Sequence, residues 1–420
     1  MPIKSQGCAH TEEGGGVSTS KKTSLESNSD REDSPPPSDG GIRLVNTFEL
    51  CFGKLDGYNE EHTSIKLLAL SVCRSIVSLA SFKGRIRQFT CTGTIIEHTP
   101  PSMRILTSAS LIRSSEEDGS KILDKLKIKV RLPSGKLVIG TLWKYDSYYN
   151  IAVVNIKASP ELREACIHNQ VPANVKLSQS KLVAIGRAFE SGELMATGGT
   201  LLHGTTKFDC QQLMASTCKI TKAGIGGLIV GSDGKFMGMS FYYKDGAPFL
   251  PFSILQKCLK HFNEFGRVVQ LSLGLRIGSL QAEKLHVREQ VSDKSPAADS
   301  GIKVGDVITK IDKLELFNAQ EFHELILDKP ECILRHGEEM PFTVCVLRPN
   351  SNGHEFPATI NAVIDSNEQN SWLVPKTKWL YPDDIRDADK MPLVRKRFKP
   401  DYTFPPLDGM DLHTEDSDEE

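Results

Sequence analysis

Residues 222–241, KAGIGGLIVGSDGKFMGMSF, decide the fold of this chain. They begin with a glycine-containing loop, AGIGG, and continue as two short apolar runs separated by the turn residues SDGK. Two strand-like runs that flank such a turn are typical of a β-hairpin. The stretch therefore predicts a tight loop that leads into a hairpin of a β-rich domain.

The sequence around this hairpin has the same character. Between residues 60 and 265, short β-branched apolar runs alternate with Gly, Asp, Ser and Asn, and few segments have a helical period. Many short strands at regular spacing predict a β-sandwich or a pair of barrels. The clearest expected strands are SIVSLASF (75–82), CTGTIIEH (91–98), RILTSASLI (104–112), KIKVRLPSG (127–135), KLVIGTLWKYD (136–146) and IAVVNIKA (151–158).

A second unit is expected over residues 268–350. It contains the strand-like runs LSLGLRIGSL and MPFTVCVLR, with the segment NAQEFHELILDK between them. In that segment Phe322, Leu325 and Ile326 recur at helical spacing after Asn318, which is a suitable N-cap. The second unit is therefore predicted to be a small α+β domain.

The two ends of the chain have a different composition from these units. Residues 1–42 and 351–420 are rich in polar and charged residues with little to bury, so we expect disordered tails, the second with the acidic end DLHTEDSDEE. The formal net charge of the whole chain is −2. A charge so close to zero gives no reason to expect a nucleic-acid or a membrane partner.

The cysteines and the apolar segments bear on metal sites and on location. The ten cysteines form no CxxC pair and no Cys/His cluster at zinc-finger spacing, so we expect no metal or other cofactor and favour free thiols over disulfides. No stretch has the apolar length of a signal-peptide core or of a membrane span. A cytoplasmic or nuclear protein follows by elimination.

Several segments together resemble one known family. The order CTGTII, ILTSASLI, DSYYNIAVVNI and AGIGGLIVGSDGKFMGMSF, followed by a PDZ-like segment, is similar to that of the HtrA/Deg (protease Do-like) serine proteases. The similarity covers roughly residues 60–350. It implies a mainly β protein, in which a trypsin-like double six-stranded β-barrel over residues 60–265 is followed by a PDZ domain over residues 268–350.

The resemblance also locates the positions of a catalytic triad, and none of the three holds the expected residue. The histidine of the family falls on Ser110, the aspartate on Asn150 and the nucleophilic serine on Ile225. A hydroxyl does not exchange protons at neutral pH as an imidazole does, and an amide carries no charge to stabilise an imidazolium. Isoleucine has no atom that attacks a carbonyl. We therefore expect no catalytic residues at these positions.

The loop around the nucleophile position is altered as well. Ala223, Gly224 and Ile225 stand where the family motif G-N-S-G-G has its first three residues. Ala223 adds a Cβ where the family uses glycine to aim an amide at the oxyanion, so the oxyanion loop is predicted to be vestigial. Gly226 and Gly227 still match the turn of the motif.

The PDZ-like segment keeps more of its pattern. The resemblance implies that Leu273, Gly274 and Leu275 form the loop that binds a C-terminal carboxylate. It also implies a groove between the following strand, which carries Ile277, and the helix, which carries Phe322 and Leu325. The expected partners are protein C-termini or extended peptides that add as a strand. The alternative is a domain that packs on the barrels and binds no peptide. Because relatives are often trimers, a homo-oligomer also remains open.

These features favour a catalytically inactive HtrA/Deg-like protein that binds peptides or acts as a scaffold. Two alternatives remain open: a serine-type endopeptidase that uses unidentified residues, and a holdase-like chaperone. His98 and His203 are the histidines that could approach the cleft. The lone cysteines Cys91, Cys210 and Cys218 are interpreted as small core residues rather than as nucleophiles.

Overall fold

A computed structural model describes twelve parts of the chain, namely residues 48–53, 60–113, 122–165, 181–202, 208, 210, 212–279, 285–291, 293–317, 319–336, 341–348 and 354–364. The predicted tail over residues 1–42 lies outside them, as does most of the tail over residues 351–420.

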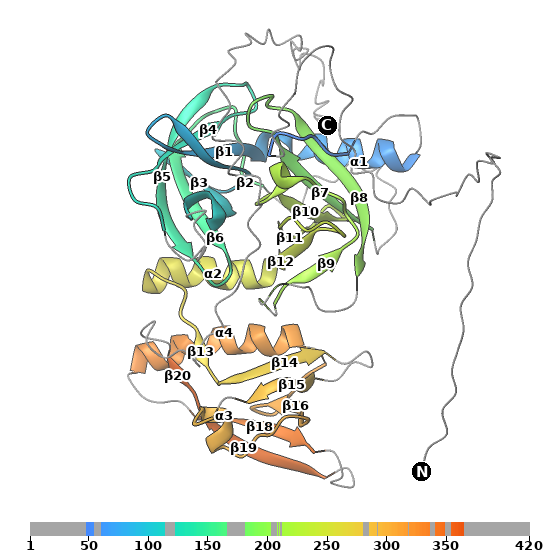
Figure 1. The fold of residues 1–420 in the computed structure, drawn as a ribbon, viewed down its shortest axis with the longest axis vertical. Helices are drawn as coiled ribbons and strands as arrows, with labels where there is room; N and C mark the ends of the chain where they lie inside the picture. Colours follow the sequence, from blue (N-terminus) through green and yellow to red (C-terminus); the bar gives the residue numbers. More distant parts are fainter. Residues whose placement is uncertain are drawn as a thin grey trace, which may run out of the picture. The chain divides into compact units, whose positions relative to one another are not determined.

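The first half of the described chain closes into a barrel with the strand order β1-β2-β3-β6-β5-β4, coloured from blue to teal in Figure 1. All neighbouring strands are antiparallel, and the barrel closes where β1 pairs with β4. Its strands are β1 (Ile76–Lys83), β2 (Ile86–Thr99), β3 (Ser102–Ser108), β4 (Lys127–Arg131), β5 (Leu137–Asp146) and β6 (Ile151–Lys157).

The next part of the chain closes into a second barrel, coloured green to yellow, with the order β10-β11-β12-β9-β8-β7. The predicted hairpin is formed by β10 and β11, joined by a tight turn in which Gly231 N donates to Lys235 O and Gly234 has a φ of 73°. The strands are β7 (Lys181–Arg187), β8 (Leu194–Leu202), β9 (Met214–Ser216), β10 (Leu228–Gly231), β11 (Phe236–Ser240) and β12 (Pro248–Pro251).

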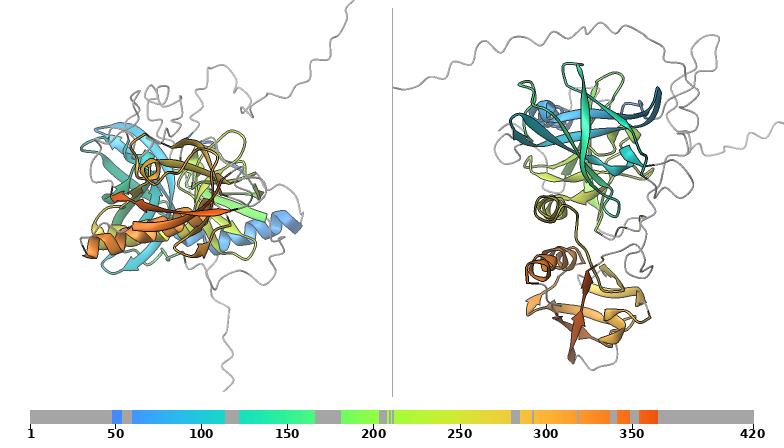
Figure 2. Two further views of the ribbon diagram at one scale, coloured as in Figure 1. Left: turned by 90° about the horizontal axis from the view of Figure 1, so that it is seen from below. Right: turned by 90° about the vertical axis from the view of Figure 1, so that its left-hand side faces the viewer.

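Two helices flank the barrels, and the strand-like pattern of residues 60–265 did not predict them. Helix α1 (Glu60–Ser71) buries Ile65 and Leu68 against the second barrel, where Gly198 of β8 leaves room for Ile65. Helix α2 (Phe252–Phe265), coloured yellow in Figure 2, contacts β11 and β12, and Gly266 caps its end with a φ of 75°. Its buried residues share one helical face, namely Ile254, Leu255, Cys258, His261 and Phe262.

Residues 271–364 form a small α+β module with its own core. Its larger sheet has the order β14-β15-β16-β18-β19, and β13 pairs separately with β20. The sheet continues past residue 350 through β19. The elements are β13 (Leu271–Ser272), β14 (Leu275–Ser279), β15 (Leu285–Val291), α3 (Pro296–Asp299), β16 (Val307–Ile311), β17 (Leu314–Glu315), α4 (Ala319–His336), β18 (Pro341–Leu347), β19 (Glu355–Asn361) and β20 (Val363–Ile364).

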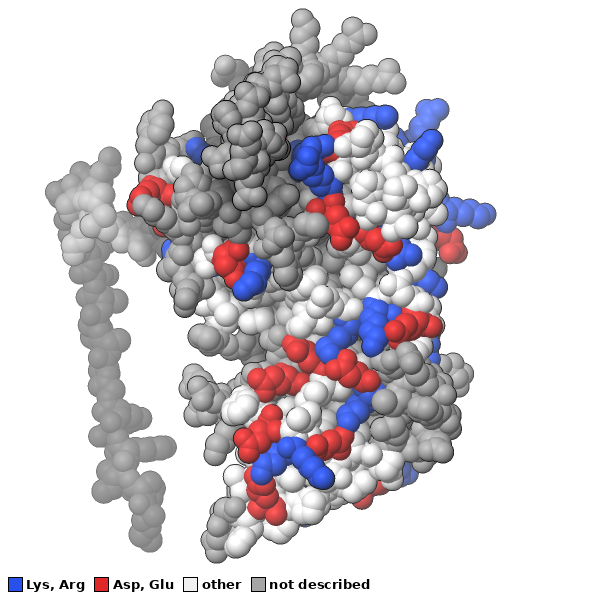
Figure 3. All heavy atoms as spheres, turned by 180° about the vertical axis from the view of Figure 1, so that it is seen from behind, with Lys and Arg blue, Asp and Glu red and all other residues white. Residues whose placement is uncertain are grey.

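The structure confirms the predicted fold class of a mainly β protein with two six-stranded barrels. It differs at the third expected strand, because β3 ends at Ser108 and a short 3₁₀ helix, η2 (Ala109–Ile112), follows. The expected helix is present as α4, while its proposed N-cap, Asn318, lies outside the described residues. On the face shown in Figure 3, basic and acidic side chains are interspersed. Among the described helices, none is long and apolar enough to cross a bilayer.

Candidate functional site

The structure brings two of the three predicted triad positions into contact. Ser110 is the second residue of η2, directly after β3, and Asn150 is the last residue before β6. The side-chain amide of Asn150 donates to Ser110 Oγ at 3.0 Å, and Ala109 N donates to Asn150 O at 3.0 Å. Asn150 has a φ of 53°, a conformation that asparagine adopts more readily than most residues. The two side chains therefore lie as a buried, hydrogen-bonded pair.

This pair carries no acid–base function near neutral pH. Ser110 is 8% exposed and Asn150 is 2% exposed, so both polar groups depend on each other for hydrogen bonds. Neither a hydroxyl nor an amide gains or loses a proton in the range where a general base operates. The geometry places a hydrogen bond between two neutral groups where a proton relay would need an imidazole paired with a carboxylate.

The loop that carries the third position lies beside this pair. We call residues 221–227 the 221–227 loop. Gly226 has a φ of 76°, and a Cβ built on it would lie 3.0 Å from Ser108 N and 2.8 Å from Thr107 Oγ1. The end of β3 and the loop that holds Ile225 therefore lie in direct contact. Only a glycine at position 226 allows this contact, because any side chain would clash with β3. Ile225 itself is buried at 7% exposed and belongs to the hydrophobic core.

The backbone amides of Gly224 and Ile225 donate hydrogen bonds within this loop. A 3₁₀ turn, η3 (Lys222–Gly224), forms there, in which Gly224 N donates to Thr221 O at 3.0 Å and Ile225 N donates to Lys222 O at 3.2 Å. The amide of the nucleophile position is one of the donors that stabilise an oxyanion in serine proteases. Here that amide already has a partner within the turn. Ala223 is buried at 2% exposed, so its added Cβ is part of the core.

Side chains from both barrels hold the loop in this shape. Thr92 of β2 donates through Oγ1 to Ala223 O at 2.7 Å, and Thr92 N donates to Ile225 O at 2.8 Å. Ser240 of β11 donates through Oγ to Gly224 O at 2.8 Å. The carbonyl groups of Ala223, Gly224 and Ile225 thus bond to neighbouring strands, whereas the amides of Gly224 and Ile225 bond within the turn.

One ionisable group near Asn150 was not identified from the sequence. Asp146 accepts a hydrogen bond from Tyr149 N at 2.8 Å and so holds the turn that ends at Asn150. Burial raises the pKa of Asp146 to about 6, although the backbone N–H groups of Tyr149 and Tyr148 and the charge of Arg113 oppose the shift. The signal in the sequence was an aspartate at the start of a turn, a position where a carboxylate often accepts from the backbone.

The histidines and cysteines considered as alternatives do not complete a catalytic arrangement among the described residues. His98 is exposed near the end of β2, and His203 lies outside the described residues. Cys91, Cys210 and Cys218 are all buried and free of disulfides. Burial raises the pKa of both Cys91 and Cys210 to about 12, so their thiols stay protonated.

No metal site is evident in the part of the chain that the structure describes. A metal would need several ligating side chains that face one another. Among those residues, no group of three or more His, Cys, Asp and Glu side chains is placed to hold an ion.

In the module of residues 271–364, the residues predicted to bind peptides lie on neighbouring elements. Leu273 and Gly274 join β13 to β14, and Leu275 and Ile277 lie on β14. Among the described strands, β14 is the first of its sheet and pairs with β15 alone, and α4 contacts it. Gly274 has a φ of 69°, and a Cβ there would lie only 2.1 Å from Ser295 Cβ. A glycine is therefore required where the loop passes Ser295.

The burial of these side chains divides them into two groups. Leu273, Ile277 and Phe322 are 6%, 3% and 1% exposed and belong to the core of the module. Leu275 and Leu325 are partly buried and pack against that core from the outside. Of the predicted contacts, only Leu275 and Leu325 have side-chain surface that a peptide could reach.

Comparisons with known proteins agree with the architecture of the barrels. The family profile of the trypsin-like peptidase domain matches residues 91–239. The chain is 26% identical over 271 residues to the serine endoprotease DegS of Haemophilus influenzae, which covers 60% of this chain and 74% of the relative. It is also 26% identical over 219 residues to a probable periplasmic serine endoprotease DegP-like of Buchnera aphidicola, with 46% of each protein covered.

The fold is also that of a solved structure. A structure of the HtrA-type protease AlgW with a tripeptide matches 73% of this chain and 99% of its own with a TM-score of 0.50, at 18% sequence identity. The expectation of a cytoplasmic or nuclear protein is wrong by these comparisons, because relatives whose names state a compartment are periplasmic. The absence of an apolar run was too weak a signal for location. Through its double barrel, its motifs and its relatives, the chain resembles the HtrA/Deg (protease Do-like) trypsin-like proteins.

Proposed function

We propose that this protein is a pseudo-protease of the HtrA/Deg family, which keeps the protease fold without peptide-bond cleavage and acts by binding peptides. In this proposal residues 60–265 are the degenerate protease domain. The following module, which starts near residue 268, is a PDZ domain.

The hydrogen-bonded pair of Ser110 and Asn150 carries the first half of the proposal. A serine nucleophile needs a base that removes its proton and a charged group that orients the base. The two positions hold a neutral pair at 3.0 Å, and the third position is an isoleucine in the core. The amide of Ile225 is bonded to Lys222 O, so the oxyanion would lose a donor as well. Loss of triad members lowers turnover by about 10⁶.

Purified full-length protein tests this half. We expect no cleavage of fluorescent casein and no labelling by a serine-directed fluorophosphonate, measured beside an active HtrA-type protease under the same conditions. Labelling of any serine at one equivalent per chain would overturn the proposal and would favour an endopeptidase that uses other residues. Suppression of the aggregation of an unfolded client, without peptide binding, would favour a holdase-like chaperone.

The position of β14 supports the second half, because among the described strands of its sheet β14 pairs with β15 alone. A peptide can add as a further strand beside a strand at such a position. The turn at Gly274 directs the chain into β14, and Leu275 and Leu325 flank this position from the strand and from α4. A peptide carboxylate bound by the backbone amides around Gly274 would be a charge-assisted contact, stronger than a neutral one.

Peptide titrations of the full-length chain test the second half. Peptides with a free C-terminus should bind with a Kd of about 1 μM, and the amidated forms about tenfold or more weakly. Leu325→Ala should change which C-terminal side chain is preferred, whereas Phe317→Ala, a change at a side chain that is 60% exposed, is the control and should leave binding unchanged. Equal binding of free and amidated peptides would show that the loop does not recognise a carboxylate.

A further inference from the structure

A short segment before α1 runs across the 221–227 loop. Thr221 donates through Oγ1 to Leu50 O at 2.5 Å, and the ring of Phe52 is buried at 8% exposed. A Cβ built on Gly224 would lie 2.9 Å from Phe52 Cε1, and one built on Gly186 of β7 would lie 3.3 Å from Phe52 Cζ. The ring of Phe52 therefore occupies space that two glycines leave open.

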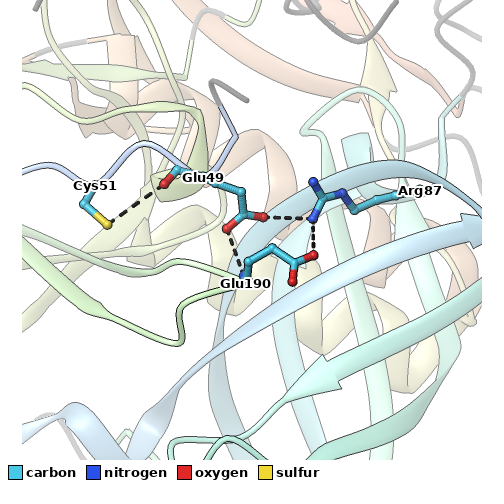
Figure 4. A network of polar contacts seen from close by, with 4 residues as sticks. All are labelled: Glu49, Cys51, Arg87 and Glu190. Atoms are coloured by element: carbon cyan, nitrogen blue, oxygen red, sulfur yellow. Dashed lines mark hydrogen bonds and ion pairs between the residues drawn. The ribbon is translucent and has the colours of Figure 1, made fainter. Parts of the chain in front are cut away.

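The same segment is attached to both barrels by polar contacts, shown in Figure 4. The carboxylate of Glu49 accepts from Arg87 Nη1 at 3.0 Å and from Glu190 N at 2.9 Å. Arg87 belongs to β2 of the first barrel, and Glu190 follows β7 of the second barrel. Arg87 also pairs with the carboxylate of Glu190 at 2.7 Å. One guanidinium thus joins the segment to the turn after β7.

Two further contacts extend this attachment. The ring of Phe48 meets the ring of Phe89 of β2 edge-on, with centroids 5.0 Å apart. Cys51 donates through Sγ to Glu193 Oε2 at 3.0 Å. Together with the contacts of Glu49, Leu50 and Phe52, these two contacts mean that every residue from 48 to 52 touches one of the barrels or the 221–227 loop.

The contact of Phe52 with the loop depends on the glycine at position 224. The family motif G-N-S-G-G has an asparagine there, whereas this chain has glycine. Neither Gly224 nor Gly186 has a left-handed φ, so the lack of a side chain, and not backbone freedom, is what these positions provide. An asparagine side chain at position 224 would displace the ring of Phe52.

We propose that residues 48–53 are an intramolecular latch that holds the 221–227 loop in its closed turn. In this view the amides of Gly224 and Ile225 bond within the turn because a segment about 170 residues away in sequence, together with the Cβ of Ala223, holds the turn closed. A contact with Leu50 O fixes Thr221, which is the N-cap of the turn, and the ring of Phe52 lies against the last residue of the turn. Release of the latch would free the amides of Gly224 and Ile225.

Hydrogen exchange of the full-length protein tests the latch without reference to cleavage or peptide binding. Phe52→Ala and Thr221→Val should each speed deuterium uptake in peptides that span residues 45–53 and 220–228. The loss of about 1.4 kcal/mol of local stability corresponds to about tenfold faster exchange. Peptides of β1 and β3 should exchange as in the wild type. Phe317→Ala, which removes an exposed phenylalanine ring, is the matched control and should change neither region.

A second variant tests the contact from the side of the loop. Gly224→Ala should displace Phe52 and speed exchange in residues 45–53, and the double variant Phe52→Ala/Gly224→Ala should add little to Phe52→Ala alone, because both changes remove one contact. Unchanged exchange at residues 220–228 in folded Phe52→Ala would overturn the latch. So would equal acceleration in every barrel strand, since Phe52 would then be an ordinary core residue.

Discussion

Replacement of Thr92 by valine should destabilise the protein more than the same change two residues earlier on β2. Thr92 Oγ1 donates to Ala223 O at 2.7 Å and accepts from Arg187 N at 2.9 Å. Valine has nearly the same shape but cannot form either hydrogen bond. The buried groups Ala223 O and Arg187 N would therefore each lose the Thr92 hydroxyl as a partner. Each such loss costs about 1–3 kcal/mol, which predicts about 2–6 kcal/mol for Thr92→Val.

Thr90→Val is the matched control on the same strand. Thr90 is 2% exposed, and its hydroxyl has no hydrogen-bond partner among the described residues. Its replacement should change the free energy of unfolding by no more than about 0.5 kcal/mol, or should stabilise the protein, because it removes a buried polar group without a partner. Urea denaturation of the full-length variants, followed by circular dichroism, measures both values. Equal effects of the two changes would refute the conclusion that Thr92 holds the 221–227 loop.

Three further predictions follow from the same contacts. Ile225→Ser alone should yield no casein cleavage. The rate of casein cleavage by the triple variant Ser110→His/Asn150→Asp/Ile225→Ser should remain about 10² to 10³ below that of an active relative, because the closed turn withholds an oxyanion donor. Efficient cleavage by the single variant would reveal an unrecognised base. Burial raises the pKa of Glu49 from 4.5 to about 7, so the folded state takes up a proton there and the contribution of Glu49 to stability should rise as the pH falls from about 8 to about 5. The melting temperature of the wild type relative to that of Glu49→Gln should therefore increase over that range, and a difference that decreased would contradict the prediction. Gly274→Ala should destabilise the protein more than Gly301→Ala. Both positions have a positive φ, but only a Cβ at position 274 would have an atom within 4 Å, namely Ser295 Cβ. Thermal unfolding compares the two variants, and equal losses of stability would contradict the close approach of Ser295 to the loop.

Much of the architecture follows from local patterns in the sequence. The runs that predict β1, β2, β4, β5 and β6 alternate or are fully apolar over the length of a strand, and short-range patterns of this kind report which faces are buried. The helices α1 and α2 were missed because their apolar residues occur within a region dominated by strand-like runs. The helix α4 was predicted because its apolar residues repeat clearly at helical spacing.

The sequence by itself determined which chemical groups the three predicted triad positions carry, because the identity of a side chain decides whether it exchanges a proton. Only the tertiary structure decided how those positions are held. Asn150 donates to a serine 40 residues away, Thr92 bonds to Ala223 in the other barrel, and Phe52 fills the space beside Gly224. Such contacts join residues that are far apart in the chain, and no local periodicity encodes them. They appear only when closure of the two barrels brings β2, the 221–227 loop and residues 48–53 to one place.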